Sequence, residues 1–173
     1  MIHRHKAALP FGAQRFLAIF EGIEGGFAVG TSIIVALYMA GVEFRVLLLT
    51  AILTIVVSGF NAASIKYASE HYFDELDGRE KRSSIKHYFL PALVEFLLYA
   101  GISLLVILPL LFLPLPQAIA LCATATLGVL FVAGYMKGQL LRMKPVRDGV
   151  EAVLLGMGII TLGLLSGWML GSL

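Results

Sequence analysis

The chain has little charge and almost no cysteine for its length. Only 14% of its 173 residues are charged, whereas a soluble domain of this size carries about 25% charged residues. A single cysteine, Cys122, leaves no disulfide framework and no cysteine-based metal site. These scarcities exclude an ordinary soluble domain and a small, disulfide-rich secreted protein.

Apolar residues, in contrast, make up 59% of the chain and come in long blocks. A helix needs about 20 apolar residues to cross a hydrocarbon core of about 30 Å, and each block is long enough. The sequence therefore predicts an all-α integral membrane protein with five transmembrane helices. We expect an N-terminal segment outside the membrane at residues 1–15 and a single transmembrane domain at 16–173. The expected helices lie at 16–40, 44–67, 88–113, 117–141 and 148–170.

The stretch at residues 68–87 is the only sizeable hydrophilic part of the sequence. We expect it to form a loop whose first part continues the second helix for two turns. Gly78 is a suitable residue to end that helix, because glycine readily adopts the left-handed conformation that follows a helix C-terminus.

Basic residues are distributed very unevenly over the predicted loops. Three precede the first helix, five border residues 68–87 and four border the loop before the fifth helix, so twelve of the thirteen share one face and only Arg45 lies on the other. Basic residues mark the cytoplasmic side, which predicts a cytoplasmic N-terminus and an outer or lumenal C-terminus. Because membrane topology explains where the basic residues lie, we expect no nucleic-acid binding. Membrane lipid is their expected partner. A cell membrane is the expected location, with a vacuole-like membrane as the alternative.

The first apolar run contains two carboxylates, Glu21 and Glu24. An ionisable group at membrane depth costs roughly 2.5–3.5 kcal/mol and suggests a functional site. Residues three apart lie about 60° apart around a helix, on one side of it. Beside them is a glycine stripe that permits close helix packing, within the chain or in a dimer: Gly22, Gly26 and Gly30.

Glu95 is expected about as deep in the third helix as Glu21 and Glu24 are in the first. Clustered carboxylates suit hard divalent cations and can also exchange protons. The sequence thus suggests a metal and proton path lined by Glu21, Glu24 and Glu95. The alternative is that these acids reach the lipid headgroups, as we expect for Glu151 at the start of the fifth helix.

The hydrophilic stretch offers a second candidate metal site. Glu70 and Asp74 are four residues apart, as are His71 and Glu75, so one helix face could capture Fe²⁺, Mn²⁺ or Zn²⁺ at the cytoplasmic surface. The alternative is a solvated connector of mixed charge. His71 with Asp74 or Glu75 could also serve an interfacial enzyme, but no nucleophile or extended catalytic motif accompanies them. We therefore expect no enzyme.

Two motifs resemble the vacuolar iron transporter family. Glu21-Gly22, followed four residues later by Phe27-Ala28, resembles the Asp-Gly-(x)4-Phe-Ala signature of its first helix. The run FVAGYMKG at residues 131–138 resembles the Phe-Gly-Tyr-x-Lys ending of its fourth helix, and residues 67–72 resemble the end of its second. With five crossings in the same order, the resemblance covers residues 16–173.

The resemblance implies a homodimer of five-helix protomers that moves Fe²⁺ or Mn²⁺ out of the cytoplasm against protons. It places Glu21 at the family's membrane aspartate, while Thr54 and Ala62 stand where the family has a glutamate and a methionine on the path. By this alignment Thr54 can offer an oxygen, and Asn61 is the nearest substitute for the methionine, so the resemblance implies these two as neutral oxygen ligands. The stretch at 68–87 is too short for the long metal-binding helical domain of some members. We therefore expect a short member of the family without a permanently bound cofactor. The rival reading is a non-transporting membrane scaffold or metal sensor that keeps the fold.

Overall fold

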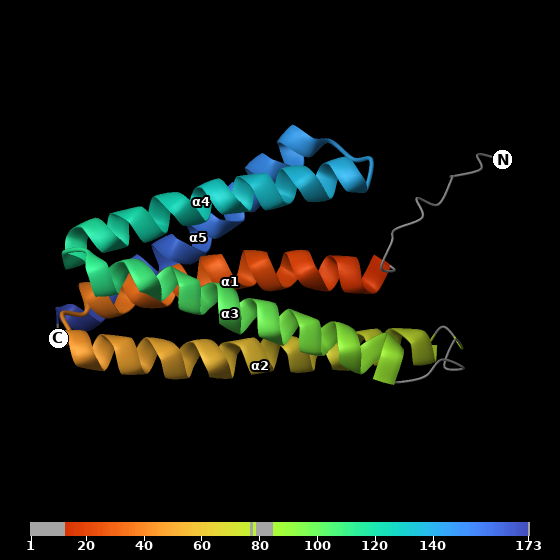
Figure 1. Cartoon of the computed structure of the whole chain (residues 1–173), viewed down its shortest axis with the longest axis horizontal. Helices are drawn as coiled ribbons and strands as arrows, with labels where there is room; N and C mark the ends of the chain where they lie inside the picture. The colour runs from red at the N-terminus through yellow and green to blue at the C-terminus, as the bar shows by residue number, and fades with distance from the viewer. Residues whose placement is uncertain (1–12, 77, 79–84, 173) are drawn as a thin grey trace.

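The computed structural model describes residues 13–76, 78 and 85–172. In this part of the chain the structure contains helices and no strand, and five helices are long and apolar enough to cross a membrane. This confirms the predicted all-α fold with five spans (Figure 1). The elements are α1 (Ala13–Met39), α2 (Phe44–Leu76), the π-helix η1 (Ile85–Phe89), α3 (Leu90–Phe112), α4 (Leu115–Leu140) and α5 (Pro145–Gly171). The predicted N-terminal segment at 1–15 lies mostly outside the described residues.

The helix boundaries follow local chain chemistry more closely than the predicted ranges did. α2 continues to Leu76 and stops before Gly78, which has a φ of +67°, so the extension of this helix was predicted correctly. α5 begins at Pro145, three residues earlier than expected, because proline is tolerated in a first helical turn where its missing N–H leaves no bond unmade. Pro109 does not end α3, which runs on until Leu113 adopts an extended conformation.

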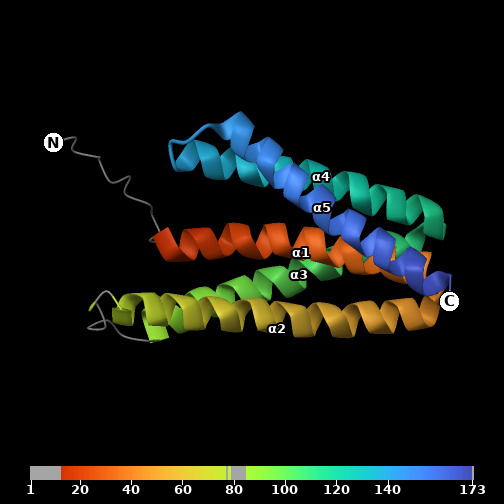
Figure 2. The ribbon, with the colours of Figure 1, turned by 180° about the vertical axis from the view of Figure 1, so that it is seen from behind.

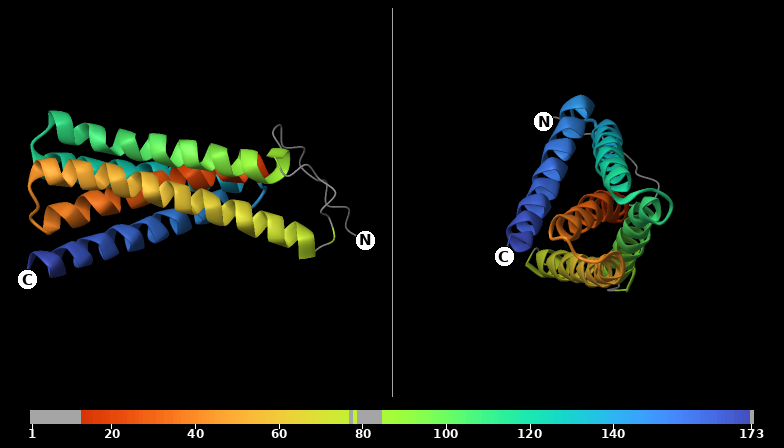
Figure 3. Two further views of the ribbon diagram at one scale, coloured as in Figure 1. Left: turned by 90° about the horizontal axis from the view of Figure 1, so that it is seen from below. Right: turned by 90° about the vertical axis from the view of Figure 1, so that its left-hand side faces the viewer.

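α1 is the helix around which the others pack. It contacts all four of the other long helices, most extensively α3 and α5. The end-on view in Figure 3 shows α1 (orange) enclosed by the others, and Figure 2, which views the bundle from behind, shows α5 crossing obliquely in front of α1. Consecutive helices run in opposite directions, so α1 begins and α5 ends at opposite ends of the bundle (Figure 1).

The glycine stripe of α1 packs against α3 of the same chain. A Cβ atom at Gly22 would lie 2.9 Å from Leu98 Cβ, and one at Gly26 would lie 2.8 Å from the carbonyl oxygen of Tyr99. Neither contact leaves room for a side chain, so glycine is what allows α1 and α3 to approach. A second copy could reach this stripe only by displacing α3, so the structure does not support the expected dimer contact through this face.

Buried hydrogen bonds fix how α1 is rotated against its neighbours. Thr31 and Thr126 share a hydroxyl–hydroxyl hydrogen bond of 2.6 Å between α1 and α4. The Ser103 hydroxyl of α3 donates to the Gly26 carbonyl at 2.8 Å. The three hydroxyl groups are buried and cannot bond to water instead. The two hydrogen bonds therefore favour one rotation of α1 about its own axis. That rotation decides which side chains the carboxylates of α1 can reach.

Candidate functional site

A largely shielded lysine lies among three carboxylates near one end of the bundle. Lys66 of α2 forms a short ion pair and hydrogen bond with Glu21 of α1. Its Nζ also lies 3.3 Å from Glu70 Oε1 and 3.9 Å from Glu95 Oε2. We call these four residues the Lys66 cluster. It joins α1, α2 and α3 at the end where the distribution of basic residues predicts the cytoplasm.

Helix geometry explains how these four residues meet. Lys66 and Glu70 are four residues apart on α2 and therefore share one face. A Cβ atom at Gly22 would lie 3.0 Å from the Glu95 carbonyl oxygen, so the glycine next to Glu21 brings the two backbones together at this level. The glycine stripe thus places an α1 carboxylate beside an α3 carboxylate.

The cluster is well shielded from solvent, except on one side. The Lys66 and Glu95 side chains are 10% and 9% exposed, whereas Glu21 is 46% exposed. Glu70 Oε2 and Glu95 Oε2 are buried and have no hydrogen-bond partner among the described residues. Three carboxylates and one ammonium give the ionised cluster a formal charge of −2. The cluster therefore has spare oxygen ligands and unbalanced negative charge, which favour a cation.

A second ion pair joins α1 to α4, whereas the Lys66 cluster joins α1 to α2 and α3. Lys137 of α4 donates to both carboxylate oxygens of Glu24, at 2.8 and 2.9 Å. This pair borders a cavity of about 210 Å³ that is also lined by Asp148 and Glu151 of α5. The spacing of Glu21 and Glu24 suggested a shared site on α1. The structure instead pairs them with different lysines, each on a different neighbouring helix.

The two expected neutral ligands of α2 lie away from the cluster. Thr54 is half-buried and precedes Lys66 by twelve residues, roughly 18 Å along a helix. Asn61 is exposed, and it lies on roughly the opposite side of α2 from the buried Gly59 and Ala63. The structure thus brings Glu21 and Glu95 together without Thr54 or Asn61.

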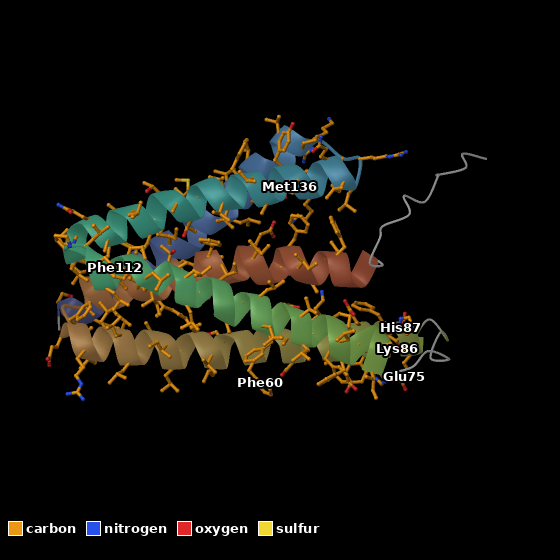
Figure 4. The ribbon with its side chains drawn as sticks, viewed as in Figure 1. Phe60, Glu75, Lys86, His87, Phe112 and Met136 are labelled. Atoms are coloured by element: carbon orange, nitrogen blue, oxygen red, sulfur yellow. The ribbon has the colours of Figure 1, made fainter. Side chains whose placement is uncertain are left out.

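The expected cytoplasmic capture set does not come together either. Glu70 faces Lys66, Asp74 accepts a hydrogen bond of 2.9 Å from the Tyr88 hydroxyl, and the His71 ring stacks on Tyr67 at a centroid distance of 6.1 Å. Glu75 is exposed at the end of α2, near the start of η1 (Figure 4). Within the described ranges, no three His, Cys, Asp or Glu side chains are arranged to hold a metal ion.

Sequence reasoning treated Lys66 and Lys137 only as charges that border loops. Their pairing had partial signals in the sequence. Lys66 precedes Glu70 by four residues, the spacing of a helical ion pair, and Lys137 lies within the motif-like run at residues 131–138, at the position of the family's lysine. What the sequence lacked was the rotation of each helix, which alone decides the carboxylate that each lysine meets.

A comparison with known protein families identifies the family of this chain. The model of the VIT family matches residues 61–168, more than half of the chain. The matched region runs from the middle of α2 through most of α5, and it includes Lys66, Glu70 and Glu95. No curated protein and no solved structure matches the chain. The chain belongs to the VIT family, the vacuolar iron transporters, which are membrane transporters of metal ions.

Proposed function

We propose that this protein exports a divalent transition metal, Fe²⁺ or Mn²⁺, from the cytoplasm in exchange for protons. The observation that carries the proposal is the Lys66 cluster, in which carboxylates from three helices lie around one largely shielded ammonium group. Glu21, Glu70 and Glu95 are the proposed metal ligands. With the ammonium between them they are not arranged to hold a metal ion, so metal binding requires these carboxylates to move together. Membership in the VIT family supports metal transport, and the basic face of the chain supports the direction.

The oxygen ligands of the cluster match the chemistry of hard cations. Carboxylates suit Mn²⁺ well, and borderline Fe²⁺ also binds them, whereas soft thiolate or thioether ligands are absent from the cluster. When a dication leaves, closely spaced carboxylates repel one another and take up protons. Glu21, the most exposed of the three, is the proposed point at which metal and protons exchange with water.

Glu24 has a different place in the proposal. It pairs with Lys137 of α4, outside the cluster, and lines the cavity that Asp148 and Glu151 also line. We assign it to a second polar position beside the path and not to the ligand set of Glu21. Thr54 and Asn61 are not assigned as ligands of the Lys66 cluster. The homodimer stays part of the proposal, through a surface other than the glycine stripe.

The alternative function is a membrane scaffold or metal sensor that binds without transporting. The observation that favours it is that both lysines neutralise carboxylates of α1, as purely structural ion pairs would. The two functions differ in flux. A scaffold binds metal at most on one side of the membrane, whereas a transporter moves metal across it.

Metal uptake by liposomes that contain the purified protein tests the proposal. Mn²⁺, Fe²⁺, Co²⁺ and Zn²⁺ are added outside vesicles whose lumen is either acidic or at the outer pH. We expect uptake of Mn²⁺ or Fe²⁺ that increases severalfold with the acidic lumen, because protons leaving the vesicle drive metal in. Protein-free liposomes are the control for leakage. Absence of uptake for every metal, with folded protein, would favour the scaffold.

A further inference from the structure

We propose that Lys66 is a built-in cation that keeps the metal site closed, and that a divalent metal binds by displacing its ammonium group. The Nζ atom lies where a bound cation is expected, between oxygens of Glu21, Glu70 and Glu95. This inference rests on the proposed function for its biological role. Its geometry can be tested without transport.

The ammonium satisfies the site only in part. It is hydrogen-bonded to Glu21, but its distances of 3.3 Å to Glu70 and 3.9 Å to Glu95 exceed a charge-assisted hydrogen bond of about 2.7–2.9 Å. A hard dication binds carboxylate oxygens at about 2.0–2.6 Å, so those two side chains would move inward by roughly 1–2 Å. A dication would also balance the formal charge of −2 that one ammonium leaves.

Glu95 provides an independent indication that a ligand belongs here. Its side chain is more than nine-tenths buried, and its Oε2 faces the cluster without a hydrogen-bond partner among the described residues. A buried carboxylate oxygen without such a partner is costly. A coordinated metal would satisfy this oxygen, whereas the present Lys66 position does not.

Lys66 also has a way to leave. Its charge sits on a flexible four-carbon stem, which can keep its apolar part buried while the ammonium moves toward water. Glu21 marks the solvent side of the cluster, with nearly half of its side chain exposed. An ammonium that swings past Glu21 would open the centre of the cluster. Without a divalent metal, the ammonium returns and blocks the site to ions of lower charge.

Binding of Mn²⁺ to Lys66→Gln in detergent is the first test, with free Mn²⁺ measured by electron paramagnetic resonance. Removing the competing charge is expected to tighten the Mn²⁺ Kd by about tenfold relative to wild type, because a like charge at this distance opposes a dication strongly. Lys66→Arg keeps the charge and should bind no more tightly than wild type. Lys144→Gln, at an exposed position before α5, makes the same charge change away from the cluster and should leave the Kd unchanged. An unchanged or weaker Kd in Lys66→Gln would overturn the inference.

Wild-type protein provides a second test that does not depend on how a variant folds. An amine-reactive ester is added with and without Mn²⁺, and acylation of Lys66 is measured by mass spectrometry. Displacement predicts that Mn²⁺ raises acylation of Lys66 severalfold and leaves Lys144 unaffected. No rise at saturating Mn²⁺ contradicts displacement.

The two proposals fail in different ways. Tighter Mn²⁺ binding by Lys66→Gln without uptake by wild-type liposomes would refute transport and keep the role of Lys66. Uptake with an unchanged Kd in Lys66→Gln would keep transport and refute that role.

Discussion

Glu21→Gln is expected to lower Mn²⁺ uptake by liposomes about a hundredfold, because losing even an outer-shell partner of a metal ligand commonly costs about 10–100-fold in affinity or activity. Glutamine preserves the shape of the side chain but removes the charge that balances both Lys66 and the metal. Glu21 is also the proposed ligand nearest to water, since it is the most exposed member of the cluster. Uptake is measured at equal amounts of protein with an acidic lumen.

Two variants make this result specific. Glu43→Gln removes a carboxylate from the exposed connection between α1 and α2, at the other end of the bundle, and should retain wild-type uptake. Glu24→Gln removes the carboxylate that pairs with Lys137 and should lower uptake less than Glu21→Gln does. Equal losses in Glu21→Gln and Glu24→Gln would mean that both sides of α1 carry the metal. Wild-type uptake in Glu21→Gln would remove Glu21 from the path.

Gly167→Leu is expected to destabilise the protein by about 3 kcal/mol, at the upper end of the range for overpacked positions. A Cβ atom there would lie only 2.1 Å from the carbonyl oxygen of Ala36 on α1. The contact is with backbone, so no side-chain rotation can relieve it and α5 must move away. The melting temperature in detergent should fall on the order of 10 °C.

Gly158→Leu provides the matched control on the same helix. Gly158 is exposed, and a Cβ atom there would meet nothing within 4 Å. Its melting temperature should stay within a few degrees of wild type, because both variants share the helix propensity of leucine and differ only in the contact. Equal stability of the two variants would contradict the close packing of α5 on α1.

The architecture could be predicted from sequence because the bilayer imposes it. Long apolar blocks must become helices in lipid, where every backbone group needs a partner within the segment. The same local reasoning predicted the extension of α2 toward Gly78. It failed at the start of α5, where Pro145 and Arg147 suggested a loop although the helix already begins at Pro145.

The side-chain partners could not be predicted because they depend on how each helix is rotated. A rotation of one residue is about 100°, enough to move Glu21 or Glu24 from one neighbour to another. Sequence spacing predicted that both carboxylates lie on one side of α1, about 60° apart around the helix. In the structure this angle is enough for Glu21 to pair with Lys66 of α2 and for Glu24 to pair with Lys137 of α4. The alignment that proposed Asn61 as a ligand likewise carries no rotation of α2, and the structure leaves Asn61 exposed.

The position of bound Mn²⁺ is the most direct test of the central claim, that the Lys66 cluster is the metal site. Anomalous X-ray scattering from crystals of the purified protein grown with Mn²⁺ would locate the ion. The account predicts a peak about 2.0–2.6 Å from carboxylate oxygens of Glu21, Glu70 and Glu95, with the Lys66 ammonium moved away. A peak instead between Glu24, Asp148 and Glu151, with Lys66 still paired to Glu21, would contradict it.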